Sequence, residues 1–227
     1  MATDVAGKTF VDQLIKEVIL PARDLLMDSQ YFTDLRAGKL TMRRLQGFSL
    51  EHTWFNRRLL KGGGLRLLQA ENDRALMGIL RGIEAEVTHP DMCKKFGLSI
   101  GLTETDFENH IPTFATLSHT SVIVASGVTL NNAASGRTSG LANETIVQRY
   151  AMEFAEYLPK APYNINKDAL EFFIVHGVAD VDHSTIAAEA VARLAETDRD
   201  KELVWYSAKN QVSLKLAKFQ AIYDEYA

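Results

Sequence analysis

Apolar residues recur at helical spacing over long stretches of this 227-residue chain. Phe10, Leu14 and Val18, for example, fall on one side of a helix predicted between Thr9 and Ser29. Runs of β-branched residues are few, and the chain contains only five prolines. Long strands would need the opposite pattern, with alternation at every second residue. The sequence therefore predicts an all-α protein, and because no repeat or low-complexity linker divides it, a single domain over residues 1–227.

The overall composition narrows the classes of function. With 46% hydrophobic residues and a formal net charge of −4, the chain shows no basic stripe, which argues against nucleic acid as a partner. No apolar stretch reaches 18 residues and no secretory signal is visible, so we expect no membrane association. The lone Cys93 excludes an intramolecular disulfide and fits the reducing cytoplasm.

One stretch, residues 171–183, combines apolar and ligand-type side chains. Within it, His176, Asp180 and His183 stand at positions i, i+4 and i+7, which share one face of an α-helix. Two imidazoles and a carboxylate on one stripe suit a first-row metal such as iron, manganese or zinc. The flanking residues are apolar, so the stripe is predicted to be buried, where ionisable groups need partners.

A plainer interpretation of the same stretch is a solvated helix face with an i,i+4 His–Asp pair. Two features argue against it. The flanks, such as Phe172 and Phe173, are too apolar for a solvated face. Gly177 lies in mid-helix at a propensity cost of about 1 kcal/mol relative to Ala, which indicates a close packing contact.

Two weaker signals point to the same chemistry. Glu86 and His89 are spaced i,i+3 near the predicted end of a helix, although most such pairs are surface residues. Glu84 is a rival to Glu86, because residues two apart face different directions on a helix. Glu144 lies near the start of another predicted helix.

The helix boundaries follow from caps and breakers. Thr41 and either Asn72 or Asp73 are predicted N-caps, Thr103 opens a short helix with capping chemistry, and Asn166 or Asp168 caps the helix of the His176 motif. Breakers predict a kink at Pro21, a break at Gly62–Gly64 and a helix end at Pro90 after residues 74–89, with Cys93 in the polar loop that follows.

In the second half of the chain we predict a helix rich in small residues over 113–134, a loop over 135–140 and a helix over 141–158. A new helix is predicted from Ser184 or Thr185 to about 195, and a last helix over 199–226.

The order of these motifs resembles a known family. Residues 34–41, followed by an aromatic helix containing His52-Thr-Trp-Phe55, resemble the N-terminal part of the TenA/PqqC-like superfamily. Glu86-x2-His89, then Glu144, then His176-x3-Asp180-x2-His183 are similar to the ligand set of the haem-oxygenase-like diiron oxidases, also called dimetal oxidases. The resemblance spans most of the chain and implies a haem-oxygenase-like helical bundle of about seven helices.

The resemblance also implies a metal site and an activity. The implied ligands of two iron ions, or of a manganese–iron pair, are Glu86, His89, Glu144, His176, Asp180 and His183. The reduced centre would react with O2 to give a peroxo-diiron(III) intermediate that oxidises a bound substrate. The implied substrate is a small carboxylic acid, an amino acid or a fatty acid, that undergoes C–C or C–N cleavage or N-oxygenation. Such a reaction needs an external reductant.

The resemblance leaves alternatives and departures. The chain could be a cofactorless PqqC-like oxidase, or a non-catalytic binding protein that keeps the fold. Thiaminase-type relatives use a nucleophilic Cys, for which Cys93 is unsuited, and the first helix lacks the proximal His of haem oxygenases. Family members commonly form dimers, and the apolar residues Leu214, Leu216 and Phe219 are compatible with a homodimer.

Overall fold

A computed structural model describes the backbone of residues 2–227 and the side chains of residues 5–177 and 184–227. All regular structure in this backbone is helical, and residues 2–227 contain no strand. In chain order the elements are α1 (Ala2–Leu14), the π-helix η1 (Ile15–Ile19), α2 (Leu20–Met27), α3 (Gln30–Arg36), α4 (Met42–Leu67), α5 (Asp73–Glu86), α6 (His89–Ser99), α7 (Glu104–Glu108), α8 (Phe114–Thr129), α9 (Ala133–Tyr157), the 3-10 helix η2 (Lys167–Leu170), α10 (Glu171–Leu194) and α11 (Asp198–Glu225). The prediction of an all-α bundle is confirmed, with more and shorter helices than the seven or so expected.

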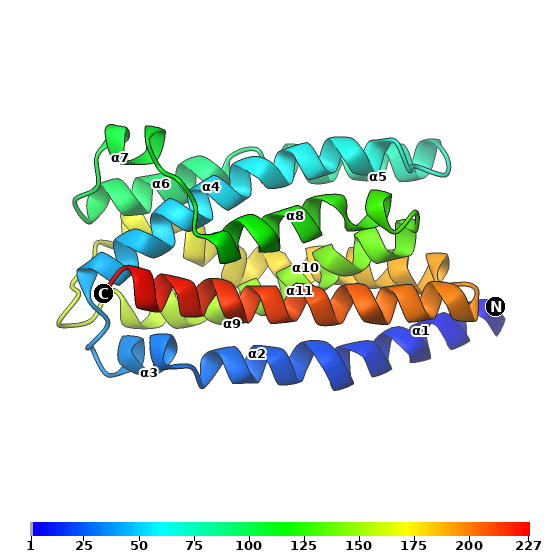
Figure 1. Ribbon diagram of the computed structural model, residues 1–227, viewed down its shortest axis with the longest axis horizontal. Helices are drawn as coiled ribbons and strands as arrows, with labels where there is room; N and C mark the ends of the chain where they lie inside the picture. The colour runs from blue at the N-terminus through cyan, green and yellow to red at the C-terminus, as the bar shows by residue number, and fades with distance from the viewer. Residues whose placement is uncertain (1) are drawn as a thin grey trace.

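The long helices lie side by side along the length of the molecule, with α11 across the middle and the α1–α2 and α4–α5 layers on either side of it (Figure 1). α9 packs against α10, α11 and α8, and α4 packs against α6 and α8. Aromatic rings fill the space between them. Phe154 on α9 lies 4.5 Å from Phe173 on α10 and 4.8 Å from Phe48 on α4, measured between ring centroids. None of the helices in the described residues is long and apolar enough to cross a membrane.

Several predicted caps are confirmed. Thr41 Oγ1 accepts a hydrogen bond from the backbone N–H of Arg44, and Asn72 Oδ1 accepts one from Ala75. Thr103 forms a full capping box with Asp106 at the start of α7. Asn166 caps η2, the short turn that leads into α10, rather than α10 itself.

The predicted break at the glycine triplet is wrong, because α4 continues to Leu67. The glycines allow close helix packing instead of ending the helix. A Cβ at Gly63 would lie 2.5 Å from Ile83 Cγ1 on α5, and one at Gly62 would lie 3.2 Å from Val124 on α8. The tertiary contacts thus outweigh the low helix propensity of glycine.

The boundary predicted around residues 134–140 is also wrong. α8 ends at Thr129, Asn131 adopts a positive φ of 48°, and Asn132 caps a helix that already begins at Ala133. Gly127 and Gly136 meet where α8 and α9 cross: a Cβ on either would lie 3.2 Å from the other's Cα. Small residues at 135–140 therefore serve helix packing, and the predicted loop does not exist.

Two further boundaries differ. The turn before Pro21 forms the π-helix η1, which accommodates a residue that has no N–H and would clash with the carbonyl four residues earlier. α10 continues through Ser184 to Leu194, so the separate helix predicted from Ser184 does not occur. No helix breaker stands at Ser184, and its side chain alone did not justify a boundary.

Candidate metal centre

Three of the predicted ligands meet in the interior. The ligand atoms of Glu86, His89 and His176 all lie within 4.8 Å of one another. The side chains of His89 and His176 are buried, with 4% and 5% exposure, and Glu86 is partly buried. The three residues come from the end of α5, the start of α6 and the second turn of α10.

The position of His89 differs from the sequence prediction. We predicted one helix that Pro90 ends; instead α5 ends at Glu86 and Pro90 lies in the first turn of α6. A proline fits there because the first N–H groups of a helix have no intrahelical acceptor. Val87 and Thr88 between the two helices keep right-handed helical dihedrals, so the i,i+3 relation is preserved and His89 Nδ1 lies 2.7 Å from Glu86 Oε2.

A backbone contact sets the orientation of His176. Its Nδ1 lies 2.7 Å from the carbonyl oxygen of Phe172, one turn earlier on α10. Because a carbonyl only accepts, the proton is on Nδ1 and the lone pair is on Nε2. Metal-binding histidines are commonly oriented in this way, with one nitrogen donating to a carbonyl and the other facing the ion.

Glu144 is not part of the three-residue cluster. It is partly buried on α9, and Asn143 Nδ2 lies 3.4 Å from its Oε1. Glu144 and Glu86 both act electrostatically on Arg66, near the end of α4. Burial lowers the pKa of the Arg66 guanidinium, while the negative charges of Glu144 and Glu86 act in the opposite direction. Both carboxylates therefore lie within the electrostatic reach of one arginine.

Asp180 and His183 lie outside the residues whose side chains the structure describes. The backbone of α10 is helical from Glu171 to Leu194, as the spacing of the motif requires. Glu84, the rival to Glu86, is exposed on α5 and does not belong to the cluster. The geometry therefore favours Glu86.

The donor set fits an iron ion. One carboxylate and two imidazoles, from three elements that converge in the bundle interior, match the ligands that non-haem iron uses. A buried carboxylate is unfavourable unless a positive charge compensates it, and a bound cation would offset its negative charge.

Cys93 was predicted to lie in a polar loop, which is wrong. It is buried within α6, and burial raises the pKa of its thiol to about 12. A protonated thiol is a poor nucleophile. The structure thus gives a different reason for the same conclusion, that Cys93 is unsuited to thiaminase chemistry.

A polar network lies next to the cluster, and its two buried lysines were not among the predicted site residues. His52 Nε2 lies 3.0 Å from the hydroxyl of Tyr150, and His52 Nδ1 lies 3.0 Å from Lys218 Nζ on α11. Lys215, one turn earlier, is also buried. The signal was present in the sequence: the two lysines fall on the same face of the last helix as the core residue Phe219.

Comparison with known protein families identifies the family of this chain. Residues 68–216 match a protein family described as iron-containing redox enzymes, and this range covers more than half of the chain. The chain belongs to this family. The matched range includes all six predicted ligands, from Glu86 to His183. No match was found among curated proteins.

Solved structures share the fold. A domain of unknown function with a haem oxygenase-like fold from Shewanella denitrificans is 18% identical, with a TM-score of 0.80 over 92% of this chain and 90% of that one. A TenA homologue from Pseudomonas syringae is 13% identical, with a TM-score of 0.81 over 94% and 92% of the two chains. A TenA homologue from Pyrococcus furiosus is 15% identical, with a TM-score of 0.77 over 94% and 100%. The predicted haem-oxygenase-like, TenA-like fold is confirmed.

Proposed function

We propose that this protein is a non-haem diiron oxidase that activates O2 and oxidises a small carboxylic acid, by C–C or C–N cleavage or by N-oxygenation. The observation that carries the proposal is the buried cluster of Glu86, His89 and His176 in a chain of the iron-containing redox family. Bound iron would supply the electrons that reduce O2, and an external reductant would restore the ferrous state.

The residues of the chain have distinct parts in this proposal. Glu86, His89 and His176 would hold iron, and the carbonyl of Phe172 fixes the orientation of the His176 ring. Glu144, Asp180 and His183 would complete the ligand set for two ions. Arg66 offsets the negative charge of Glu86 and Glu144 while no metal is bound.

The surrounding side chains would control access of water. Phe172 lies beside both histidines, with ring centroids 4.2 Å from His176 and 6.5 Å from His89. Aromatic walls exclude solvent and strengthen every electrostatic contact inside. We further propose that the protein acts in the cytoplasm, where its single cysteine stays reduced, and that it forms a homodimer.

Iron binding tests the proposal directly. Metal-free protein is loaded with ferrous iron without oxygen, and then iron content and O2 consumption are measured. We expect two irons per chain and O2 uptake that a substrate acid accelerates. Glu86→Ala should lower both readings, whereas the matched variant Glu84→Ala, two residues away on the exposed side of α5, should change neither.

Two other results would contradict the proposal or its ligand assignment. Iron content at background level would contradict the proposal and favour a cofactorless oxidase of PqqC type or a non-catalytic binding protein. Equal losses in Glu84→Ala and Glu86→Ala would contradict the ligand assignment alone.

A further inference from the structure

The last helix places charged groups inside the bundle. Lys215 and Lys218 on α11 are 1% and 0% exposed, and Gln211 on the same helix is fully buried. α11 packs here against α4, α8 and α9. Moving an ammonium group out of water is strongly unfavourable unless an opposite charge accompanies it. A buried lysine that has no such charge beside it therefore needs an explanation that core packing does not give.

Lys218 lacks such a charge. Its Nζ lies 3.0 Å from His52 Nδ1 and 4.3 Å from the ring centroid of Phe55, and no carboxylate forms an ion pair with it among the side chains of residues 5–177 and 184–227. Its ammonium is held by an imidazole and an aromatic face. Both are neutral partners for a positive charge.

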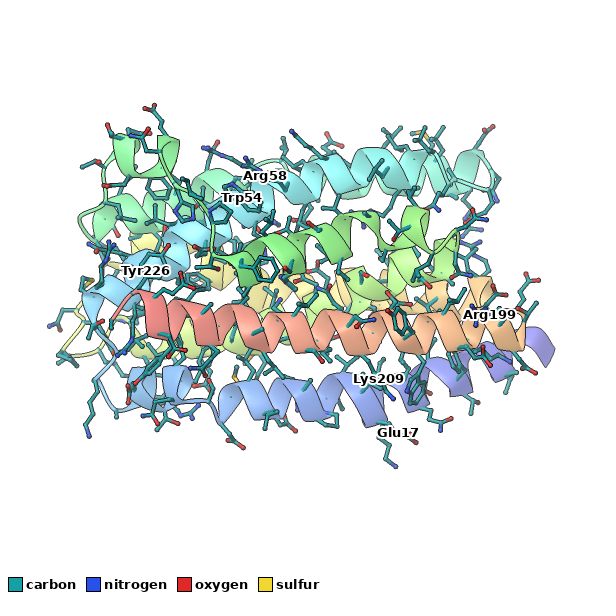
Figure 2. The ribbon with its side chains drawn as sticks, viewed as in Figure 1. Glu17, Trp54, Arg58, Arg199, Lys209 and Tyr226 are labelled. Atoms are coloured by element: carbon teal, nitrogen blue, oxygen red, sulfur yellow. The ribbon has the colours of Figure 1, made fainter. Side chains whose placement is uncertain are left out.

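The carboxylate that acts on Lys218 from a distance is occupied elsewhere. Glu51 on α4 attracts Lys218, but its oxygens accept hydrogen bonds from Tyr226 Oη at 2.9 Å and from the Thr113 N–H at 3.1 Å. His110 Nε2 lies 3.3 Å from the same carboxylate. Tyr226 is at the C-terminal end of α11, beside α4 (Figure 2). These contacts keep Glu51 away from Lys218.

The second lysine adds to the positive field. Lys215 Nζ donates to Asn143 Oδ1 at 2.6 Å and lies 5.3 Å from the Tyr150 ring centroid. Burial, together with the positive charges of both lysines, holds the pKa of His52 and of His119 well below the ordinary value. Two lysines and two neutral histidines thus share one water-poor region.

This region also contains an N–H group with no acceptor. His119 Nε2 lies 2.7 Å from Gln211 Nε2, while His119 Nδ1 and Gln211 Oε1 have no hydrogen-bond partner among the described residues. If the amide N–H donates, His119 carries its proton on the unpaired Nδ1; if the amide is turned over, its NH2 is unpaired instead. Either way one buried donor lacks an acceptor, which native interiors rarely allow.

We propose that this part of the interior, which we call the lysine site (His52, His119, Gln211, Lys215 and Lys218), binds the carboxylate of an acid that has an apolar chain. A carboxylate would give Lys218 its missing counter-ion and accept a hydrogen bond from the unpaired donor at His119 and Gln211. The assignment deepens the proposed function, on which it rests for the link to oxidation.

The lysine site adjoins the candidate metal centre. Lys218 contacts His52, the His52 ring lies 5.3 Å from Phe172, and Phe172 lies 4.2 Å from His176. An acid bound at Lys218 would therefore direct its chain along these aromatic rings. The lining also selects against an α-amino acid, because its ammonium group, next to the carboxylate, would face two buried lysines.

Ligand binding to the full chain, with and without ferrous iron, tests the assignment. The probes are octanoate, 2-aminooctanoate, which adds only the ammonium, and 1-octanol, which removes the carboxylate. We expect octanoate to bind at least about tenfold more tightly than 2-aminooctanoate. Lys218→Met should weaken the binding of octanoate by about tenfold or more and leave the binding of 1-octanol unchanged. Lys209→Met, at an exposed lysine of the same helix, should alter neither.

A second measurement needs no variant. In protein with 15N-labelled lysine, octanoate should shift the Nζ signal of Lys218 and raise its apparent pKa. The assignment is wrong if octanoate does not bind, if Lys218→Met binds it as well as the natural chain does, or if 2-aminooctanoate binds equally well. Normal iron uptake without octanoate binding would overturn this assignment alone, whereas octanoate binding without iron uptake would overturn the diiron proposal alone.

Discussion

The rings of His89 and His176 lie 4.2 Å apart, between centroids, although they come from different helices, α6 and α10. His89 is the first residue of α6 and follows Glu86 after a two-residue turn, at i,i+3 spacing. This spacing places the Glu86 carboxylate 2.7 Å from His89 Nδ1. A metal ion at this point would therefore join α5, α6 and α10.

The first prediction concerns this junction. Replacing His176 with Ala removes one of three clustered donors, so we expect a loss of metal affinity of about 10- to 100-fold, as is typical when a metal site loses a ligand or its support. Cobalt(II), titrated as an optical probe in place of iron, would measure the affinity. His110→Ala serves as the control, because His110 contacts Glu51 and not the cluster. Equal affinity in the His176→Ala variant and the natural chain would contradict the assignment.

The second prediction uses two adjacent glycines of α4. Gly64→Ala meets nothing within 4 Å and should raise the free energy of unfolding by about 0.5–1 kcal/mol, since alanine favours the helix. Gly63→Ala places its Cβ 2.5 Å from Ile83 Cγ1 and should lower that free energy by roughly 1–3 kcal/mol. Urea unfolding of both variants checks this. A higher free energy of unfolding in both variants would show that α5 can shift against α4 to make room for the added methyl group.

The third prediction concerns the buried carboxylate of Glu51. Burial alone would raise its pKa, but hydrogen bonds from His110, Thr116 and Thr113 lower it below the ordinary value of 4.5. A lowered carboxyl pKa stabilises the fold above the unfolded pKa, and this contribution is lost as the pH falls through the folded value. Glu51→Gln should therefore destabilise the protein by about 1–3 kcal/mol at pH 7.

The difference between Glu51→Gln and the natural chain should shrink below about pH 4.5, where the carboxyl group begins to take up a proton. Thermal unfolding across the acidic range measures it. Glu156→Gln, at a surface ion pair with Lys160, provides a control that should show almost no effect. A penalty for Glu51→Gln that is constant with pH would contradict the electrostatic explanation.

The fourth prediction concerns Lys218. Burial lowers the pKa of its ammonium group from 10.5 to about 7, so between these values the unfolded chain binds a proton that the folded chain does not. The free energy of unfolding contributed by this group must then rise with pH across that window. Lys218→Met should be more stable than the natural chain below pH 7, by up to roughly 5 kcal/mol, and the gain should fade toward pH 10.

Lys209→Met, at an exposed position on α11, should show no such pH dependence. Urea unfolding at several pH values between 6 and 10 compares the two variants with the natural chain. A gain in Lys218→Met that does not change with pH would mean that the lysine stays protonated in the folded state, with a pKa near its ordinary value.

Local sequence patterns were enough to predict the class of fold and the chemistry of the candidate ligands. Helical periodicity is a local property that each stretch carries on its own, and the caps at Thr41, Asn72 and Thr103 act within one turn. The i, i+4 and i+7 spacing of the His176 motif likewise needs only a continuous helix, which α10 provides.

The remaining features depend on packing between helices. The glycines of α4 and the small residues of α9 are poor local helix formers that packing against α5 and α8 keeps helical. The choice of Glu86 over Glu84 depended on which face of α5 meets α6 and α10, and the burial of Lys218 depended on which helices surround α11. Such features arise from contacts between residues far apart in the chain, and local propensity does not contain them.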